Sequence, residues 1–157
     1  FLAAMSIVVA FIDLDHHLIL NVIIYPSLAI SAMLLALASL LTGDWMRMVY
    51  ALVGAVALGA FYLLLALIWV DSMGGGDIKL AVVLGLVLGW LGWPQLIVGA
   101  FGAFLVGGII SIVMLAMRKV KLRGGIPFGP SMVVGAWIGI FAGVYIANWY
   151  LQISGLA

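Results

Sequence analysis

Long apolar runs, separated by short polar breaks, make up almost the whole chain. Strands of a membrane barrel would alternate in polarity with a period of two, so these runs are typical of membrane helices. Six helices are predicted, over residues 1–12, 18–41, 49–70 and 80–91, from the turn at 92–94 to 117, and from 126–130 to about 147. We therefore expect an all-α polytopic membrane protein in which residues 1–157 form one six-transmembrane-helix bundle.

The first apolar run is too short to cross a membrane. At about 1.5 Å per residue, residues 1–12 reach about 18 Å, whereas the hydrocarbon core is about 30 Å thick. The chain also begins with Phe1 and not with Met, so we expect a truncated first helix. A signal peptide is the alternative, but it needs a basic start and a small-residue cleavage site, and Asp13–His17 supplies neither.

Composition and charge indicate the environment of the protein and the side of the membrane on which its loops lie. The chain is 68% apolar, whereas about half of the residues in a soluble domain are apolar, so the lipid bilayer is its expected environment. The net charge of +1 predicts no nucleic-acid partner. Four of the six Lys and Arg residues lie in Arg118–Arg123, which the positive-inside rule places in the cytoplasm. Counting crossings back from there puts Asp13–His17 and Asp71–Lys79 on the cytoplasmic side as well.

Three glycines, Gly74, Gly75 and Gly76, precede Asp77 in the second acidic break. Each costs roughly 1 kcal/mol relative to alanine in a helix interior, so helix propensity does not explain them. Glycines allow unusual backbone dihedral angles, and they lack the Cβ atoms that would keep a peptide strand away from Asp77. A plain turn between two helices is the alternative interpretation.

Asp13 ends the first helix and Asp77 begins the fourth, so both can lie at the cytoplasmic rim of the bundle. Two carboxylates held close together share a proton: the ionised one activates a water, and the protonated one hydrogen-bonds a scissile carbonyl. Two independent acids solvated at the interface are the alternative. Asp15 would face away from Asp13 on a helix. Because only Asp13 directly follows the apolar run, it is the preferred partner of Asp77.

Other polar residues allow more than one role. Lys79 is typical of an interfacial anchor, although it could tune the acids or contact a substrate. The segment Asp13–His17 offers carboxylates and imidazoles to a metal, but the chain has no other His, so no metal site is predicted. Pro127 and Gly129 give the sixth helix a stiff, irregular start that must line a cavity or be buried. Small-residue stripes predict close helix packing, at Gly85 and Gly89 and at Gly135, Gly139 and Gly143.

Three motifs resemble those of the type IV prepilin peptidases, membrane aspartic proteases of the GxGD class. Ile12–His16 is similar to the first aspartate motif of that family, Met73–Leu80 to its GxGD motif, and Ile126–Pro130 to its proline-glycine motif. The resemblance spans all six predicted helices and implies that Asp13 and Asp77 are the catalytic pair. We expect supporting or substrate-binding roles for residues around that pair: Gly74, Gly75, Gly76, Asp15, Lys79, Pro127 and Gly129.

This resemblance implies an endopeptidase that cuts prepilins and pseudopilins after the glycine ending a short basic leader. It implies a multi-pass protein of the bacterial inner membrane, with its active site facing the cytoplasm, and no cofactor. Two departures stand out: Leu20 replaces a proline usual in relatives, and nothing corresponds to the upstream segment that bifunctional relatives link to N-methylation. We therefore expect peptidase activity only.

Two other functions stay open. A preflagellin- or presenilin-like GxGD protease would use the same pair on another membrane substrate. A small ion- or proton-coupled transporter would use Asp13 and Asp77 as its ion site. Transporters commonly show internal repeats and sites near the bilayer midplane, whereas these acids are predicted at one face and the sequence shows no convincing repeat. The protease is therefore favoured.

Overall fold

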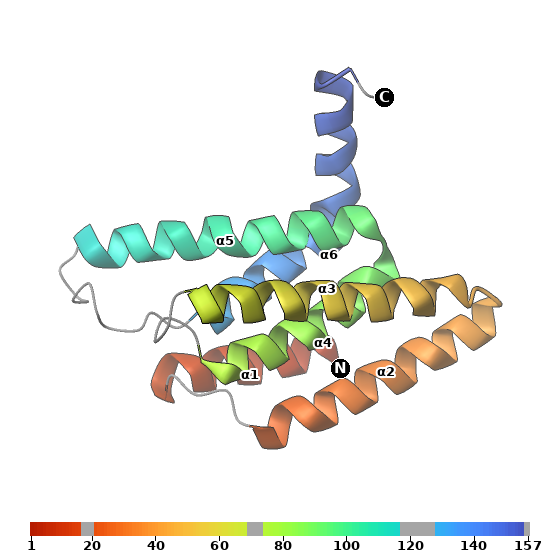
Figure 1. Ribbon diagram of the computed structural model, residues 1–157, viewed down its shortest axis with the longest axis horizontal. Coiled ribbons are helices and arrows are strands. Elements are labelled where there is room, and N and C mark those ends of the chain that lie inside the picture. Colours follow the sequence, from red (N-terminus) through yellow and green to blue (C-terminus); the bar gives the residue numbers. More distant parts are fainter. Residues whose placement is uncertain (17–20, 69–73, 117–127, 156–157) are drawn as a thin grey trace.

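A computed structural model describes residues 1–16, 21–68, 74–116 and 128–155 of the chain. Within these ranges all regular structure is helical, and no strand occurs. Six helices follow one another along the chain (Figure 1): α1 Leu2–His16, α2 Asn21–Thr42, α3 Met46–Ile68, α4 Gly75–Leu91, α5 Trp93–Ala116 and α6 Gly129–Ile153. The predicted all-α bundle of six helices is confirmed.

Four of these helices, α2, α3, α5 and α6, are long and apolar enough to cross a membrane. The other two, α1 with 15 residues and α4 with 17, are shorter than the roughly 20 residues that a full crossing requires. The chain is therefore a polytopic membrane protein whose two shortest helices, α1 and α4, are also the ones that carry the candidate acids.

Helix α4 lies at the centre of the bundle. It packs against α2, α3, α5 and α6, and its buried side chains occur on every face rather than on one stripe, as expected for a helix surrounded by others. The surrounding helices expose large apolar side chains to the outside, which suits contact with lipid. Representative exposed residues are Leu41, Val56, Phe101 and Tyr145.

Small residues bring the most extensively packed helix pairs, α3 with α4 and α5 with α6, into backbone contact. A Cβ atom added to Gly54 of α3 would lie 2.9 Å from the Cα atom of Gly89 in α4. A Cβ atom added to Gly135 of α6 would lie 2.6 Å from the Cα atom of Ala103 in α5. The predicted stripes are therefore packing surfaces, because a larger side chain at either position would separate the helices.

Replacing Gly135 by leucine should destabilise the bundle. Overpacking typically costs about 1–3 kcal/mol, so we expect Gly135→Leu to lower the thermal midpoint in detergent by several degrees. Gly108→Leu is the matched control in α5, since nothing lies within 4 Å of a Cβ atom added there. An equal loss of stability in both variants would contradict the packing role of Gly135.

Helix α4 begins earlier than predicted, at Gly75 and not at residue 80. The physical reason is a cap: the Asp77 carboxylate accepts a hydrogen bond from the Gly74 N–H at 3.1 Å, and the Asp77 N–H donates to the Gly74 carbonyl at 3.0 Å. These two bonds and the favourable negative charge in the first turn offset the low helix propensity of glycine. Helix α6 also differs from the prediction, because it continues past residue 147 to Ile153.

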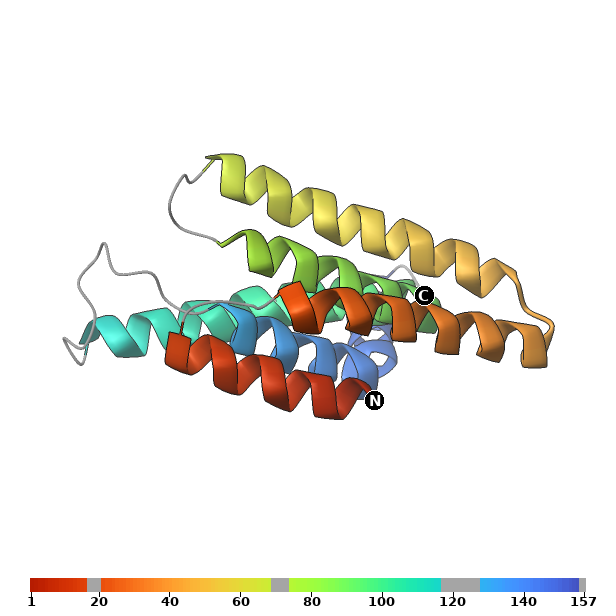
Figure 2. The ribbon, with the colours of Figure 1, turned by 90° about the horizontal axis from the view of Figure 1, so that it is seen from below.

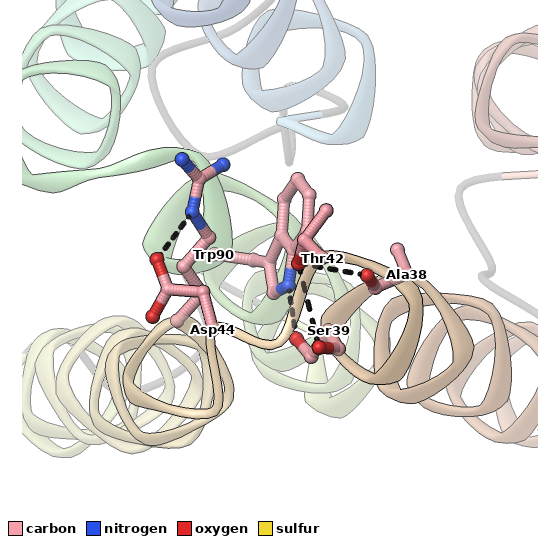
Figure 3. A network of polar contacts seen from close by, with 6 residues as sticks. Ala38, Ser39, Thr42, Asp44 and Trp90 are labelled. Atoms are coloured by element: carbon pink, nitrogen blue, oxygen red, sulfur yellow. Dashed lines mark hydrogen bonds and ion pairs between the residues drawn. The ribbon is translucent and has the colours of Figure 1, made fainter.

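A polar network holds the other end of α4 (Figure 3). The Trp90 indole N–H donates to the Ser39 hydroxyl at 2.9 Å, which joins the last turn of α4 to α2. The guanidinium carbon of Arg47 lies 5.2 Å from the centre of the Trp90 ring, and Arg47 also pairs with Asp44 at 3.0 Å. This network therefore anchors the central helix to the turn between α2 and α3.

Candidate active site

The end of α1 and the starts of α2, α4 and α6 gather at one end of the bundle, on the left in Figures 1 and 2. Two hydrogen bonds connect these termini in pairs. The end of α1 meets the start of α6 through Asp13 and Gly129, and the start of α4 meets the start of α2 through Lys79 and Asn21. The described parts of the two acidic breaks, with Asp13 and Asp77, lie at the same end of the bundle; that this end faces the cytoplasm stays a prediction.

Asp13 lies in the last turn of α1 and is only 5% exposed. Its Oδ2 atom accepts a hydrogen bond of 2.9 Å from the N–H of Gly129, the first residue of α6. A carboxylate is favoured there, because a helix N-terminus presents unpaired N–H groups and a partial positive charge. Gly129 also has to lack a side chain, since a Cβ atom would lie 2.5 Å from Asp13 Oδ2.

Asp77 is held in a similar way at the start of its own helix. It is 8% exposed, and its carboxylate accepts the Gly74 N–H described above. Gly74 and Gly75 beside it are exposed, and nothing lies within 4 Å of a Cβ atom added to Gly75. A nearly buried acid is therefore bordered by an open surface without side chains.

The expectation of an unusual backbone at the glycines is wrong for Gly74. Its φ of −75° and ψ of 150° are accessible to any residue, and the described glycines with positive φ lie elsewhere, at Gly43, Gly92 and Gly155. Gly75 and Gly76 belong to the first turn of α4. Backbone strain therefore does not explain the glycine run, and both close approach of another group and a plain turn between helices stay open.

Asp13 and Asp77 come from distant parts of the chain but lie near each other in the structure. They are close enough for the charge of Asp13 to act on Asp77, and both are buried at the same end of the bundle. Burying a carboxylate is costly unless it is paired or hydrogen-bonded, so a buried acid in a membrane protein is a candidate for a functional site. Two carboxylates that lie close together can share a proton, and that Asp13 and Asp77 do so stays a prediction.

Tyr62 is a residue of this site that the sequence interpretation missed. It lies in α3, is 1% exposed, and is near enough to Asp77 for an electrostatic interaction. Its ring stacks on Phe104 with centroids 5.7 Å apart and meets Phe128, next to Gly129, at 5.9 Å. The sequence did offer one indication of Tyr62: its phenol hydroxyl lies inside the apolar run 49–70, which carries no charge.

Lys79 is more than an anchor at the membrane surface. Its Nζ atom donates to the Asn21 side-chain oxygen at 2.6 Å and lies 5.2 Å from the centre of the Tyr25 ring. Both partners belong to the first turns of α2, which follows α1 in the chain. Lys79 therefore joins α4, the helix that carries Asp77, to the start of α2.

Some predicted positions lie outside the described residues. Pro127, Leu20 and the basic segment 118–123 are among them, and so is the side chain of Asp15, although its backbone belongs to α1. Within the described ranges, no group of three or more His, Cys, Asp or Glu residues could hold a metal ion. The site that the structure describes is thus built around the two acids, with Gly74, Lys79, Gly129 and Tyr62 beside them.

Comparison with known proteins decides the family. A profile of the type IV leader peptidase family matches residues 1–112, which include Asp13 and the run Gly74–Lys79. The chain belongs to this family. Its similarity to curated leader peptidases extends beyond residue 112 to nearly the whole chain.

Two relatives illustrate that similarity. The prepilin leader peptidase/N-methyltransferase of Pseudomonas aeruginosa is 34% identical over 159 residues, covering 98% of this chain and 51% of that protein. The protein of the same name from Bacillus subtilis is 29% identical over 154 residues, covering 96% of this chain and 58% of that protein. The chain thus spans about half the length of the curated leader peptidases it matches. No solved structure matches it at a significant level.

Proposed function

We propose that this chain is an aspartic endopeptidase of the GxGD type that removes the leader from type IV prepilins and pseudopilins. The observation that carries the proposal is the meeting of Asp13 and Asp77, two buried acids from α1 and α4, at one end of a leader peptidase. The substrate class is supported by the names of the relatives, which are prepilin leader peptidases.

The pair hydrolyses a peptide bond without a covalent intermediate. The ionised carboxylate takes a proton from a water molecule, whose oxygen bonds to the scissile carbonyl carbon, while the protonated acid gives its proton to the carbonyl oxygen. The resulting gem-diol breaks its C–N bond, and the electron pair leaves on nitrogen, which receives the proton taken from water. One hydroxyl then returns a proton to the second acid, which restores the pair and releases an acid and an amine.

The neighbouring residues position this chemistry. Gly129 fixes the Asp13 carboxylate through its N–H, and Lys79 holds the start of α2 against α4. The open surface at Gly74 and Gly75, with Gly76 beside it, lets the substrate backbone approach Asp77. Asp15 and Pro127 are proposed as supporting positions on the sequence motifs alone.

The side of the membrane on which the active site lies is inferred from the basic segment of the chain and from the position of the prepilin leader. Helix α5 ends at the same end of the bundle as that at which α4 and α6 start, as Figures 1 and 2 show. The basic segment 118–123 follows α5 in the sequence. The positive-inside rule then directs the site towards the cytoplasm. A leader on the cytosolic side of an inner-membrane prepilin could reach it there without crossing the bilayer.

The substrate class is tested by comparing three proteins with the purified chain in detergent. A prepilin with a basic leader ending in glycine should be shortened, whereas a preflagellin and a single-span protein without a leader should stay intact. A prepilin with a bulky residue in place of the leader glycine is the matched substrate control and should resist cleavage. Cleavage of the preflagellin in preference to the prepilin would contradict the proposed substrate.

A further inference from the structure

Tyr62 forms an aromatic cluster with Phe61, Phe104 and Phe128, and these three rings hold it in one orientation. Its ring is stacked on Phe104 with an angle of 21° between the planes, and it meets Phe61 edge-on with centroids 5.8 Å apart. Phe128, at 5.9 Å, covers a further side. Rings packed in this way on several sides leave the phenol little rotational freedom, so the direction of its hydroxyl is set by the bundle.

The register of α3 and α4 brings Tyr62 to the level of the acids. The helices run antiparallel, with Gly54 packed on Gly89 and Gly59 packed on Val82, whose Cγ2 atom would lie 2.7 Å from an added Cβ. Continuing that register towards the end of α3 places Tyr62 near residue 79, within one helical turn of Asp77. This proximity agrees with the electrostatic interaction between the two side chains.

A buried hydroxyl needs a hydrogen-bond partner, because leaving it unpaired in an apolar surrounding is costly. The rings of the aromatic cluster offer carbon atoms only, and among the described residues the Asp77 carboxylate is near enough to act electrostatically on Tyr62. Hydrogen bonds from a hydroxyl to a carboxylate are among the stronger ones in proteins. A donor at this point would orient Asp77 and favour its ionised form.

We propose that Tyr62 is a positioning residue of the leader peptidase, whose hydroxyl donates a hydrogen bond to the carboxylate of Asp77 during catalysis. The inference rests on the proposed function, because it assigns Tyr62 to the same pair of acids. It adds α3 to the elements that build the site, which are otherwise α1, α4 and the starts of α2 and α6. Phe128 then connects the surroundings of the two acids. It packs against Tyr62, and it directly precedes Gly129, whose N–H binds Asp13.

The test is Tyr62→Phe, which keeps the ring and removes the hydroxyl. Because a hydrogen bond to a charged group is lost, we expect kcat for prepilin cleavage to fall about 10- to 100-fold, with KM and the thermal midpoint close to wild type. Tyr50→Phe is the matched control: it removes a phenol hydroxyl from the same helix, beside Trp93 and away from the acids, and should leave kcat unchanged.

The outcomes separate the inference from the proposed function. If wild type and Tyr50→Phe cleave prepilin, the proposed function stands, and an unchanged kcat in Tyr62→Phe overturns the inference alone. A rise in KM without a fall in kcat would also overturn it, because the effect would then be on substrate binding. A fall in thermal stability that parallels the loss of rate would make Tyr62 a packing residue instead. If wild type does not cleave prepilin, the proposed function fails and the inference with it.

Discussion

Asp13→Asn and Asp77→Asn are each expected to lower prepilin cleavage by at least about 100-fold, with a nearly unchanged thermal midpoint. Asparagine keeps the shape of the side chain and an oxygen that can accept the Gly129 or Gly74 N–H, but it cannot take up or give back a proton. General acid and base catalysis contributes about 100- to 10,000-fold to enzymatic rates. The measurement is the initial rate of leader release by each purified variant.

Two further acids serve as controls for the pair. Asp44→Asn makes the same change in an exposed residue that pairs with Arg47, and it should leave the rate unchanged. Asp15→Asn should cost much less than Asp13→Asn, because residues two apart lie on different sides of a helix. Normal turnover by Asp13→Asn or Asp77→Asn would contradict the mechanism, and an inactive Asp15→Asn with an active Asp13→Asn would reverse the assignment.

Gly129→Ala is expected to lower kcat/KM by about 100-fold although it adds only one methyl group. The new Cβ atom would lie 2.5 Å from Asp13 Oδ2 and 3.1 Å from Asp13 Cγ, so the carboxyl group has to move away from the α6 N-terminus. A misplacement of about 1 Å in a catalytic group can reduce the rate by about two orders of magnitude. The rate and the thermal midpoint are measured on the same preparation.

Gly108→Ala provides the control for this substitution. It adds a methyl group to a membrane helix where nothing lies within 4 Å of the new atom, and it should retain both rate and stability. A Gly129→Ala protein that cleaves prepilin at the wild-type rate would show that the contact with Asp13 does not matter for catalysis. A loss of folding in Gly129→Ala would assign the glycine to the packing of α6.

The helices and the location of the two acids could be predicted from the sequence for a simple physical reason. Spans in a bilayer need long apolar runs, so a polar break such as Asp13–His17 marks a helix end. The start of α4 was predicted wrongly because glycine propensity was weighed without the cap that Asp77 makes with Gly74. Local propensity is a weak guide where a side chain satisfies the first turn.

Contacts between distant segments were not predictable in this way. The bond from Gly129 to Asp13 joins residues 116 positions apart, and periodicity within a helix carries no information about it. Tyr62 was missed for the same reason, because its proposed role depends on the register between α3 and α4 and on rings from α5 and the residue before α6. Resemblance pointed to Asp13 and Asp77 as the candidate pair and to residues beside them such as Gly129, whereas the contacts that these residues make emerge only from the packing.

The most direct test of the central claim is the mass of a prepilin before and after incubation with the purified chain. Wild type should shorten the prepilin by the mass of its leader, leaving one new N-terminus immediately after the leader glycine. The double variant Asp13→Asn with Asp77→Asn, folded and at the same concentration, should leave the mass unchanged. An uncut prepilin with wild type, or the same shortened product with the double variant, would contradict a leader peptidase that works through these two acids.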